Sequence, residues 1–242
     1  MRSPTWIAGF LIAGVAVFAF VNLGLWQLRR LDERRVINAE IVAAQEQDPI
    51  DLAIFLAQSG DPNDLVWRRI SAEGVYATDL EVILSGRSHK ARPGHNVLTP
   101  LILNGGAALI VNRGWIPFEL DEPPVAEATP PADRVTVVGT LRPDEGAGLL
   151  AGATGDDPVR RIASIDLVRI GADQEVGSTF DVYLQLAEQD PGQGSLPEAI
   201  PLSEVSEGSH LSYAVQWFVF AAVVLIGFPA LVWRTSQSRS AG

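Results

Sequence analysis

The chain has 242 residues, 18 Lys and Arg against 29 Asp and Glu, a net charge of −11 and no cysteine. Without cysteine, disulfides, cysteine-ligated zinc and thiolate catalysis are excluded, and with Met1 as the one methionine the soft ligands preferred by copper(I) are missing too. So acidic a chain would be repelled by nucleic-acid phosphates, which excludes nucleic-acid binding.

Two apolar stretches, residues 6–25 and 213–233, contain no charged residue. At about 1.5 Å per residue, each can span a hydrocarbon layer of about 30 Å. Four tryptophans lie at or near the ends of these stretches, where an indole prefers the headgroup boundary: Trp6, Trp26, Trp217 and Trp233. We therefore predict two transmembrane helices, over residues 6–26 and 211–233.

The N-terminal stretch also resembles a secretory signal, with Val17 and Ala19 as small residues near a cleavage site. The apolar run continues to Trp26, which favours a retained anchor. The orientation stays open on charge alone. The positive-inside rule loses force for so long a connecting segment. The acidity of the connecting segment favours its translocation out of the cytoplasm. Four basic residues next to the first stretch favour a cytoplasmic segment instead: Arg29, Arg30, Arg34 and Arg35.

Between the two stretches, residues 27–210 are predicted to form one α+β domain, mostly antiparallel β. Apolar spacing predicts a helix over residues 27–47, which Asp48-Pro49 ends, and short helices over residues 52–57 and 165–170. Short β-branched or aromatic runs separated by Gly, Pro and Asn predict the strands: residues 66–76, 81–85, 97–103, 107–111, 134–141 and 180–186.

The clearest hairpin joins residues 97–103 to 106–111 through Asn104-Gly105, a pair that tolerates the positive φ angles of a tight primed turn. Both arms are apolar without alternation, so we expect central strands that are covered on both faces. Three segments are expected to be irregular: an exposed acidic loop over 119–133, a flexible Gly-rich stretch over 143–158 and a Pro/Gly-rich tether over 190–201.

Three histidines are the candidates for binding a metal or cofactor. His89 lies in a polar basic loop and is expected at the surface, and His95 starts a strand. His210 opens the second apolar stretch, where a helix would place Tyr213, Ala214 and Trp217 on the same face. An imidazole beside aromatic rings at a membrane surface could ligate a flat apolar cofactor such as haem. The alternative is a histidine that only hydrogen-bonds at a helix start.

The sequence contains none of the enzyme motifs G-x-S-x-G, H-E-x-x-H or the Walker loop, which argues against an enzyme. Three separated segments instead resemble one family. Residues 22–31 (NLGLWQLRRL) are similar to its G-x-W-Q-x-x-R-L signature. Residues 97–101 (VLTPL) and 111–117 (VNRGWIP) are similar to its central signature. Residues 208–217 (GSHLSYAVQW) are similar to its H-L-x-Y-A-x-Q-W-F signature.

The family is that of the Surfeit-locus (Shy-type) cytochrome c oxidase assembly factors, and the resemblance runs from about Leu23 to Trp217. It implies a two-pass protein of the bacterial plasma membrane. Residues 27–210 would be extracytoplasmic, both termini cytoplasmic and residues 234–242 a short cytoplasmic tail. Residues 143–158 carry no family motif.

The resemblance further implies a role in inserting haem a into the catalytic subunit of a haem–copper oxidase, with that subunit and the lipid bilayer as partners. His210 would be an axial ligand of haem a, next to Tyr213 and Trp217. Trp26 and Gln27 would pack beside Trp217. The alternatives are a scaffold that stabilises an oxidase intermediate without binding haem and, from a different class, an envelope hydrolase.

Arg113 matches the central signature. It ends a buried strand, where a charge must find a partner or water. A structural arginine in an ion pair is the default interpretation, and Glu81 and Arg87 are the candidate partners from nearby segments. A bidentate contact to a haem propionate is the functional alternative.

Overall fold

The computed structural model describes residues 4–146, 160–173, 178–202 and 206–238. The chain divides into two compact units. Residues 1–40 and 205–242 form a helical unit, and residues 41–204 form a sheet unit.

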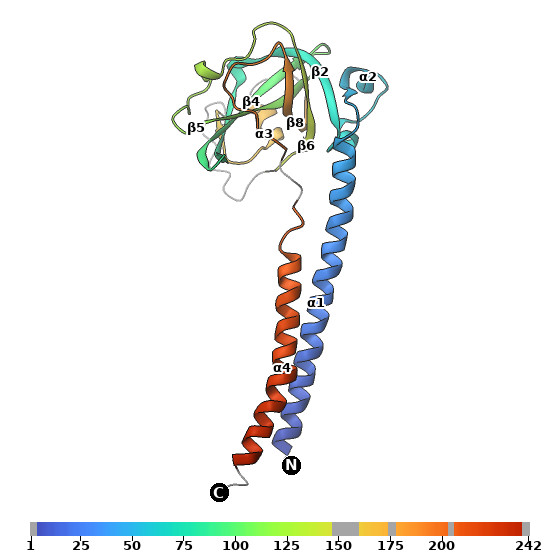
Figure 1. Ribbon diagram of the computed structural model, residues 1–242. Coiled ribbons are helices and arrows are strands. Elements are labelled where there is room, and N and C mark those ends of the chain that lie inside the picture. Colours follow the sequence, from blue (N-terminus) through green and yellow to red (C-terminus); the bar gives the residue numbers. More distant parts are fainter. Residues whose placement is uncertain (1–3, 147–159, 174–177, 203–205, 239–242) are drawn as a thin grey trace. The chain divides into compact units, whose positions relative to one another are not determined.

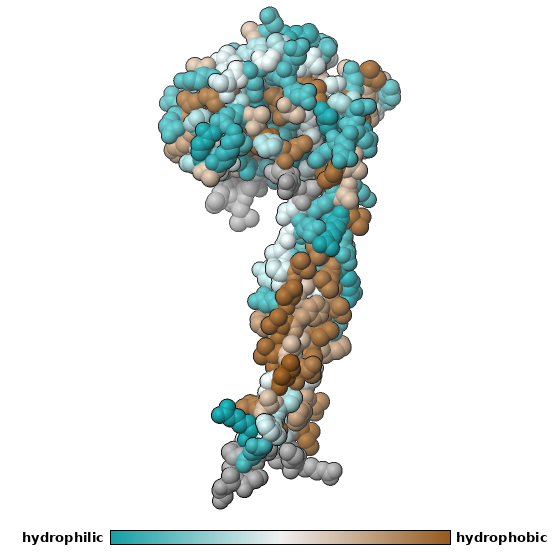
Figure 2. Space-filling view, viewed as in Figure 1, coloured by the Kyte–Doolittle hydropathy of each residue, from teal (hydrophilic) through white to brown (hydrophobic). Residues whose placement is uncertain are grey.

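The helical unit contains the long helix α4 (His210–Ser238) and, up to residue 40, the long helix α1 (Pro4–Gln45). Both are long and apolar enough to cross a membrane, and large hydrophobic side chains on their surfaces are exposed. Figure 2 shows this hydrophobic surface along both helices. The chain is therefore a membrane protein with an apolar helix near each end, as the sequence predicts. The helix predicted over residues 27–47 is a direct continuation of α1.

The two helices of this unit contact each other in antiparallel orientation. Near one end, the ring of Phe228 meets that of Phe10 edge-on, with 5.1 Å between centroids. Near the other end, His210 contacts Gln27. Residues early in α1 therefore meet residues late in α4.

The sheet unit holds the remaining elements (Figure 1). The short helices are α2 (Leu52–Ala57) and α3 (Leu167–Asp173). Single helical turns cover Pro62–Leu65, Thr78–Leu80 and Ala126–Ala128. The strands are β1 (Ile50–Asp51), β2 (Arg69–Tyr76), β3 (Val82–His89), β4 (Arg92–Leu103), β5 (Ala108–Pro117), β6 (Val135–Pro143), β7 (Arg161–Ile162) and β8 (Thr179–Asp190).

The strands form one sheet in the order β1-β2-β6-β8-β5-β4-β3-β7, and an additional pairing of β2 with β4 closes it. Strands β2, β6, β8, β5 and β4 thus form a closed ring, around which Figure 1 shows the chain curving. Most pairs are antiparallel, and β5–β8, β1–β2 and β3–β7 are parallel. The predicted class, α+β and mostly antiparallel, is confirmed.

Strand β5 is buried except at Pro117, and β4 is buried over residues 94–101, while its first two residues are exposed and its last two are half-buried. Side chains on one face, such as Leu109 and Val111, join the largest hydrophobic cluster with residues of β2, β6 and β8. Ile110, on the opposite face, packs with residues of β7 and α3. Both faces of these strands are therefore covered.

The hairpin between β4 and β5 turns through one more residue than predicted. The positive φ lies at Gly106 (81°), not at Asn104 or Gly105. The Gly106 N–H donates to Leu103 O (2.9 Å), and the Leu103 N–H donates to Ala107 O (2.9 Å). This is the pattern of a three-residue loop in which a glycine follows an ordinary turn. Of the two adjacent glycines, the second takes the left-handed conformation.

Residues 119–133 are not an exposed loop throughout, so this expectation is wrong in part. Val125 and Ala128 are buried and pack with residues of β3, β4 and β5. Composition suggested an acidic surface loop because the segment is rich in Pro, Ala and Glu. Polar groups inside the sheet unit form hydrogen bonds with the backbone of this loop, which keep it against the sheet. Of the predicted flexible stretch, residues 147–158 lie outside the described part.

Candidate functional site

Two of the predicted signatures meet in the helical unit, where His210 contacts Gln27. His210 is the first residue of α4 and follows Gly208, whose φ of 72° turns the chain into the helix. The His210 Nδ1 lies 2.9 Å from the Gln27 Oε1. Gln27 belongs to the first signature and His210 to the third, and 183 residues separate them in the sequence.

This contact orients the imidazole. An amide oxygen can only accept, so Nδ1 donates to it, and in the neutral imidazole Nε2 then carries the lone pair. A histidine that ligates a metal is normally held in this way, with its other nitrogen donating to an oxygen. Within the described residues, the structure gives Nε2 no hydrogen-bond partner. In its neutral form the imidazole can therefore present Nε2 to a metal centre, as a donor of the kind that ligates haem iron.

Small and apolar residues set the helix contact around this pair. A Cβ on Gly24 would lie 2.8 Å from ring atoms of Phe218, so only glycine leaves room for that ring. Ala214 of α4, one turn after His210, is buried, and so is Leu31 of α1. Beyond His210, the Arg35 guanidinium binds the Glu207 carboxylate in a two-bond pair at 2.9 and 3.1 Å. Polar contacts thus close the interface at this end.

The aromatic residues differ in their surroundings. Trp217 stacks on Phe20 of α1, with 5.6 Å between ring centroids, and meets Phe220 edge-on. Tyr213 is 48 % exposed, and so is Trp26. Among the described residues the ring partners of Trp217 are Phe20 and Phe220, and the expected packing of Trp26 beside Trp217 is not one of the ring contacts. Tyr213 and Trp26 both project from the helix pair.

Gln27 has a more specific contact than the sequence predicts. It was expected to pack beside Trp217 and instead binds the imidazole of His210. The sequence contains a signal for this contact: Gln27 directly follows the predicted helix over residues 6–26, and His210 directly precedes the predicted helix over residues 211–233. Antiparallel helices of equal span bring such positions to the same depth.

His89 is not at the surface as predicted, and His95 is a buried residue of β4. The His89 side chain is only 10 % exposed and its Nε2 lies 3.7 Å from the Glu198 carboxylate. His95 is buried, and its Nε2 lies 3.3 Å from Phe118 O. The described residues contain no group of three His, Asp or Glu side chains arranged to hold a metal ion.

Arg113 lies on β5 and is completely buried in the sheet unit. Its Nη2 donates to Ala128 O (2.6 Å), and its Nη1 donates to the Glu81 carboxylate (3.3 Å). The other Glu81 oxygen accepts the Val125 N–H (2.8 Å). Burial lowers the pKa of Arg113 and raises that of Glu81, while the attraction between the two groups opposes both shifts.

Arg113 thus fastens the loop around residues 125–128 to the sheet. The guanidinium also lies 5.3 Å from the centre of the Tyr76 ring, and burial raises the pKa of that phenol. All these partners belong to the sheet unit. Such an environment supports the structural interpretation of Arg113, with Glu81 as the partner proposed from the sequence.

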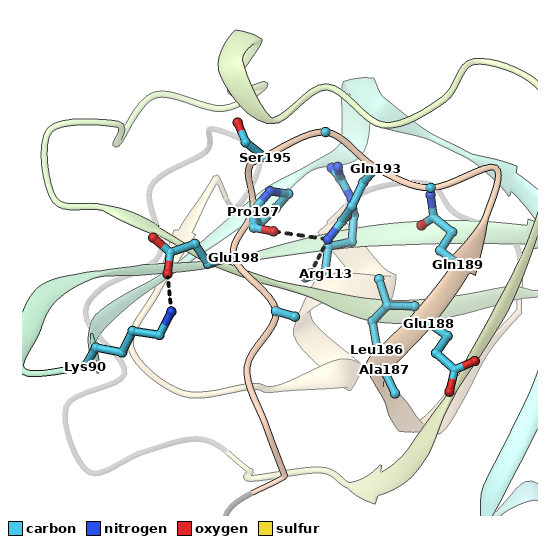
Figure 3. A pocket seen from close by; sticks show the side chains of 13 residues that line it. Lys90, Arg113, Leu186, Ala187, Glu188, Gln189, Gln193, Ser195, Pro197 and Glu198 are labelled. Atoms are coloured by element: carbon cyan, nitrogen blue, oxygen red, sulfur yellow. Dashed lines mark hydrogen bonds and ion pairs between the residues drawn. The ribbon is translucent and has the colours of Figure 1, made fainter.

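The predicted tether is bound to the sheet unit over residues 191–199, which we call the strap. Glu198 and Trp115 exchange two backbone hydrogen bonds of 2.8 and 2.7 Å. Figure 3 shows Gln193 donating to Arg113 O and Pro197 O, and Lys90 meeting the Glu198 carboxylate. A cavity of about 690 Å³ lies between the strap and β8. The strap is therefore a part of the domain and not a free linker.

The central signature Arg113-Gly114-Trp115 is explained by these contacts. Gly114 has a φ of 140°, and a Cβ there would lie 2.4 Å from Glu198 O. A side chain at this position would be strained and would also push the strap away. Trp115 supplies the backbone pair, and the Arg92 guanidinium lies 4.5 Å from the centre of its ring. All three residues serve the packing of the sheet unit.

Comparison with known proteins places these features in one family. The model of the SURF1 family matches residues 14–222. An uncharacterised SURF1-like protein of Mycobacterium bovis is 27 % identical over 98 % of this chain and 86 % of its own length. A SURF1-like protein of Rickettsia bellii is 23 % identical over 88 % of this chain and 86 % of its own. One of Dictyostelium discoideum is 30 % identical over 44 % of this chain and 45 % of its own.

Proposed function

Because the chain belongs to the SURF1 family, known generally as cytochrome oxidase assembly factors, we propose that it receives haem a and passes it to the catalytic subunit of the oxidase. In this proposal haem a is a cargo that the protein holds in transit, with His210 as an axial ligand. The protein acts as a chaperone of the respiratory chain and catalyses no reaction.

The contact between Gln27 and His210 carries the proposal. It joins the first and third family-like signatures in one place and, in the neutral imidazole, leaves the lone pair of the His210 Nε2 free to bind a metal. A purely structural histidine at a helix start would need no partner on another helix that fixes its tautomer. Tyr213 stands one turn from His210 and is half exposed, so it can contact a large flat ligand bound at the imidazole.

The position of His210 suits a cargo with mixed polarity. Haem a combines a long apolar tail with two carboxylates, so a site at the boundary of the apolar span lets the tail remain in lipid. His210 lies three residues before Tyr213, where the apolar run begins, which places it about 4.5 Å outside that run. We propose that this boundary is the outer face of a bacterial plasma membrane, with both termini cytoplasmic.

The test is to purify the full-length protein from cells that also synthesise haem a, and to record its absorption spectrum. We expect a haem a band in the wild type, a loss of it in His210→Ala and a shifted, weaker band in Gln27→Leu, in which the imidazole loses its acceptor. The matched control is His89→Ala, which removes a histidine of the sheet unit and should leave haem occupancy unchanged.

Two outcomes would contradict different parts of the proposal. If His210→Ala retains as much haem a as the wild type, His210 is not the ligand. If a strain that lacks the protein assembles oxidase with normal activity and normal haem a content, the role in assembly is wrong. A strain with impaired oxidase but a protein that never binds haem a would favour a scaffold.

A further inference from the structure

The α1 helix carries two arginines at the level where its apolar span ends. Trp6 and Trp26 are 20 positions apart, which corresponds to about 30 Å of helix and matches the hydrocarbon thickness of a bilayer. Trp26 therefore marks one boundary. Arg29 and Arg30 follow three and four residues later, about 4.5–6 Å further along the axis. This is the depth of the lipid headgroups.

Arg29 points away from α4, whereas Arg30, about 60° from Gln27 around the helix, lies at the edge of the contact side. Gln27, Leu31 and Arg35 form the side of α1 that contacts α4. At about 100° per residue, Arg29 lies about 160° from Gln27 around the helix. Arg29 is exposed, and the Arg30 side chain is 56 % exposed. At this depth and on this face, a membrane-embedded helix meets phospholipid.

The two guanidinium groups retain most of their binding capacity. Arg30 forms an exposed pair with Glu33 at 2.9 Å, a contact that contributes little in water. Arg29 makes no ion pair among the described residues. A guanidinium binds phosphate through two parallel hydrogen bonds, and Trp26, one turn away and half exposed, can rest on the glycerol region.

We propose that Trp26, Arg29 and Arg30 form a binding site for an anionic phospholipid headgroup. The site has a consequence for the rest of the chain. All 29 acidic residues lie between Asp32 and Glu207, and this segment is repelled by an anionic membrane surface. A local attraction next to Trp26 fixes the depth of α1 against that repulsion, and with it the depth of the neighbouring Gln27.

The experiment uses the full-length protein in nanodiscs that contain phosphatidylcholine mixed with phosphatidylglycerol. Native mass spectrometry counts the phosphatidylglycerol molecules that stay bound after release. We expect Arg29→Gln to lower the apparent affinity for phosphatidylglycerol about fivefold, which is the equivalent of about 1 kcal/mol per cation near the surface, and Arg29→Gln/Arg30→Gln to lower it further.

The matched control is Arg34→Gln. Arg34 is an exposed arginine on the same helix without an ion pair among the described residues, but it lies about 12 Å beyond Trp26. We expect this variant to retain the lipid as the wild type does. If Arg34→Gln weakens binding as much as Arg29→Gln, the attraction is diffuse and no site exists. Equal retention of phosphatidylcholine and phosphatidylglycerol by the wild type would overturn the proposal as well.

Discussion

At the scale of single residues, Arg113 shows how a buried charge is accommodated. Its guanidinium stays protonated under ordinary conditions, so its burial requires a counter-charge and hydrogen-bond acceptors. Glu81 supplies a counter-charge and Ala128 a carbonyl, while Nε has no partner among the described residues. Removing one member of such a pair leaves the other charge uncompensated, which costs more than the pair itself contributes.

We therefore predict that Glu81→Gln lowers the free energy of unfolding by about 3–5 kcal/mol, since Arg113 then stays buried without a counter-charge. The double variant Glu81→Gln/Arg113→Met should lose less than the sum of the two single variants. Thermal unfolding of the full-length protein in detergent measures both. Additive losses would show that the two residues do not form an energetic pair.

At the scale of elements, the contact between α1 and α4 depends on where the helix surfaces are small. Gly24 accommodates the ring of Phe218, and Ala214 lies directly beside the His210 turn. The same stretch of α1 contains Gly14, which faces open space, because a Cβ at this position would have no described neighbour within 4 Å. Two glycines of one apolar helix therefore have different roles.

The substitution Gly24→Leu should push α4 away and separate Gln27 from His210, because the new side chain would occupy the space of the Phe218 ring. We expect haem a occupancy to fall at least as far as in Gln27→Leu. Gly14→Leu adds the same side chain to the open surface and should leave the spectrum unchanged. Equal spectra for the two variants would show that this helix contact does not position the imidazole.

The strap responds to pH through Glu198. Hydrogen bonds from Arg92 and Lys90 hold the pKa of Glu198 below its ordinary value of 4.5. A carboxylate with a depressed pKa stabilises the folded state at pH values above its ordinary pKa. That contribution is lost as the pH falls through the lower, folded-state pKa. Acid should therefore loosen the strap.

Hydrogen exchange of the Trp115 and Glu198 amides measures this effect. We expect their protection factors to decrease on acidification below pH 4.5. In Glu198→Gln, which has no charge to lose, protection should be weaker at neutral pH and should not change further over this range. If the wild type keeps its protection in acid, the ion pairs do not hold the strap.

At the scale of the whole molecule, the orientation in the membrane follows from the proposed function. The chain has no cysteine, so single cysteines can be introduced without background. In intact cells with an opened outer layer, an impermeant maleimide should label Ser195→Cys, in the sheet unit, and spare Gln237→Cys, near the end of α4. The reverse pattern would place the domain in the cytoplasm and contradict delivery from the outer surface.

The two apolar helices and most of the strands could be predicted from the sequence, because they depend on local patterns of hydrophobicity. The short helix α2 (Leu52–Ala57) lies where predicted, and most residues of β4 and β5 are buried, as their apolar arms indicate. The family signatures were also readable, since they are runs of neighbouring residues. A pairing partner for Arg113 was predicted from its position alone.

The contacts between residues that are distant in the sequence could not be predicted and are seen in the folded chain alone. The closure of the sheet by β2 and β4, the burial of Val125 and Ala128 and the attachment of the strap all arise from long-range contacts. So does the pairing of Gln27 with His210, across 183 positions. Local composition cannot encode such contacts, because a buried polar group can form a hydrogen bond with any segment that the fold brings close enough.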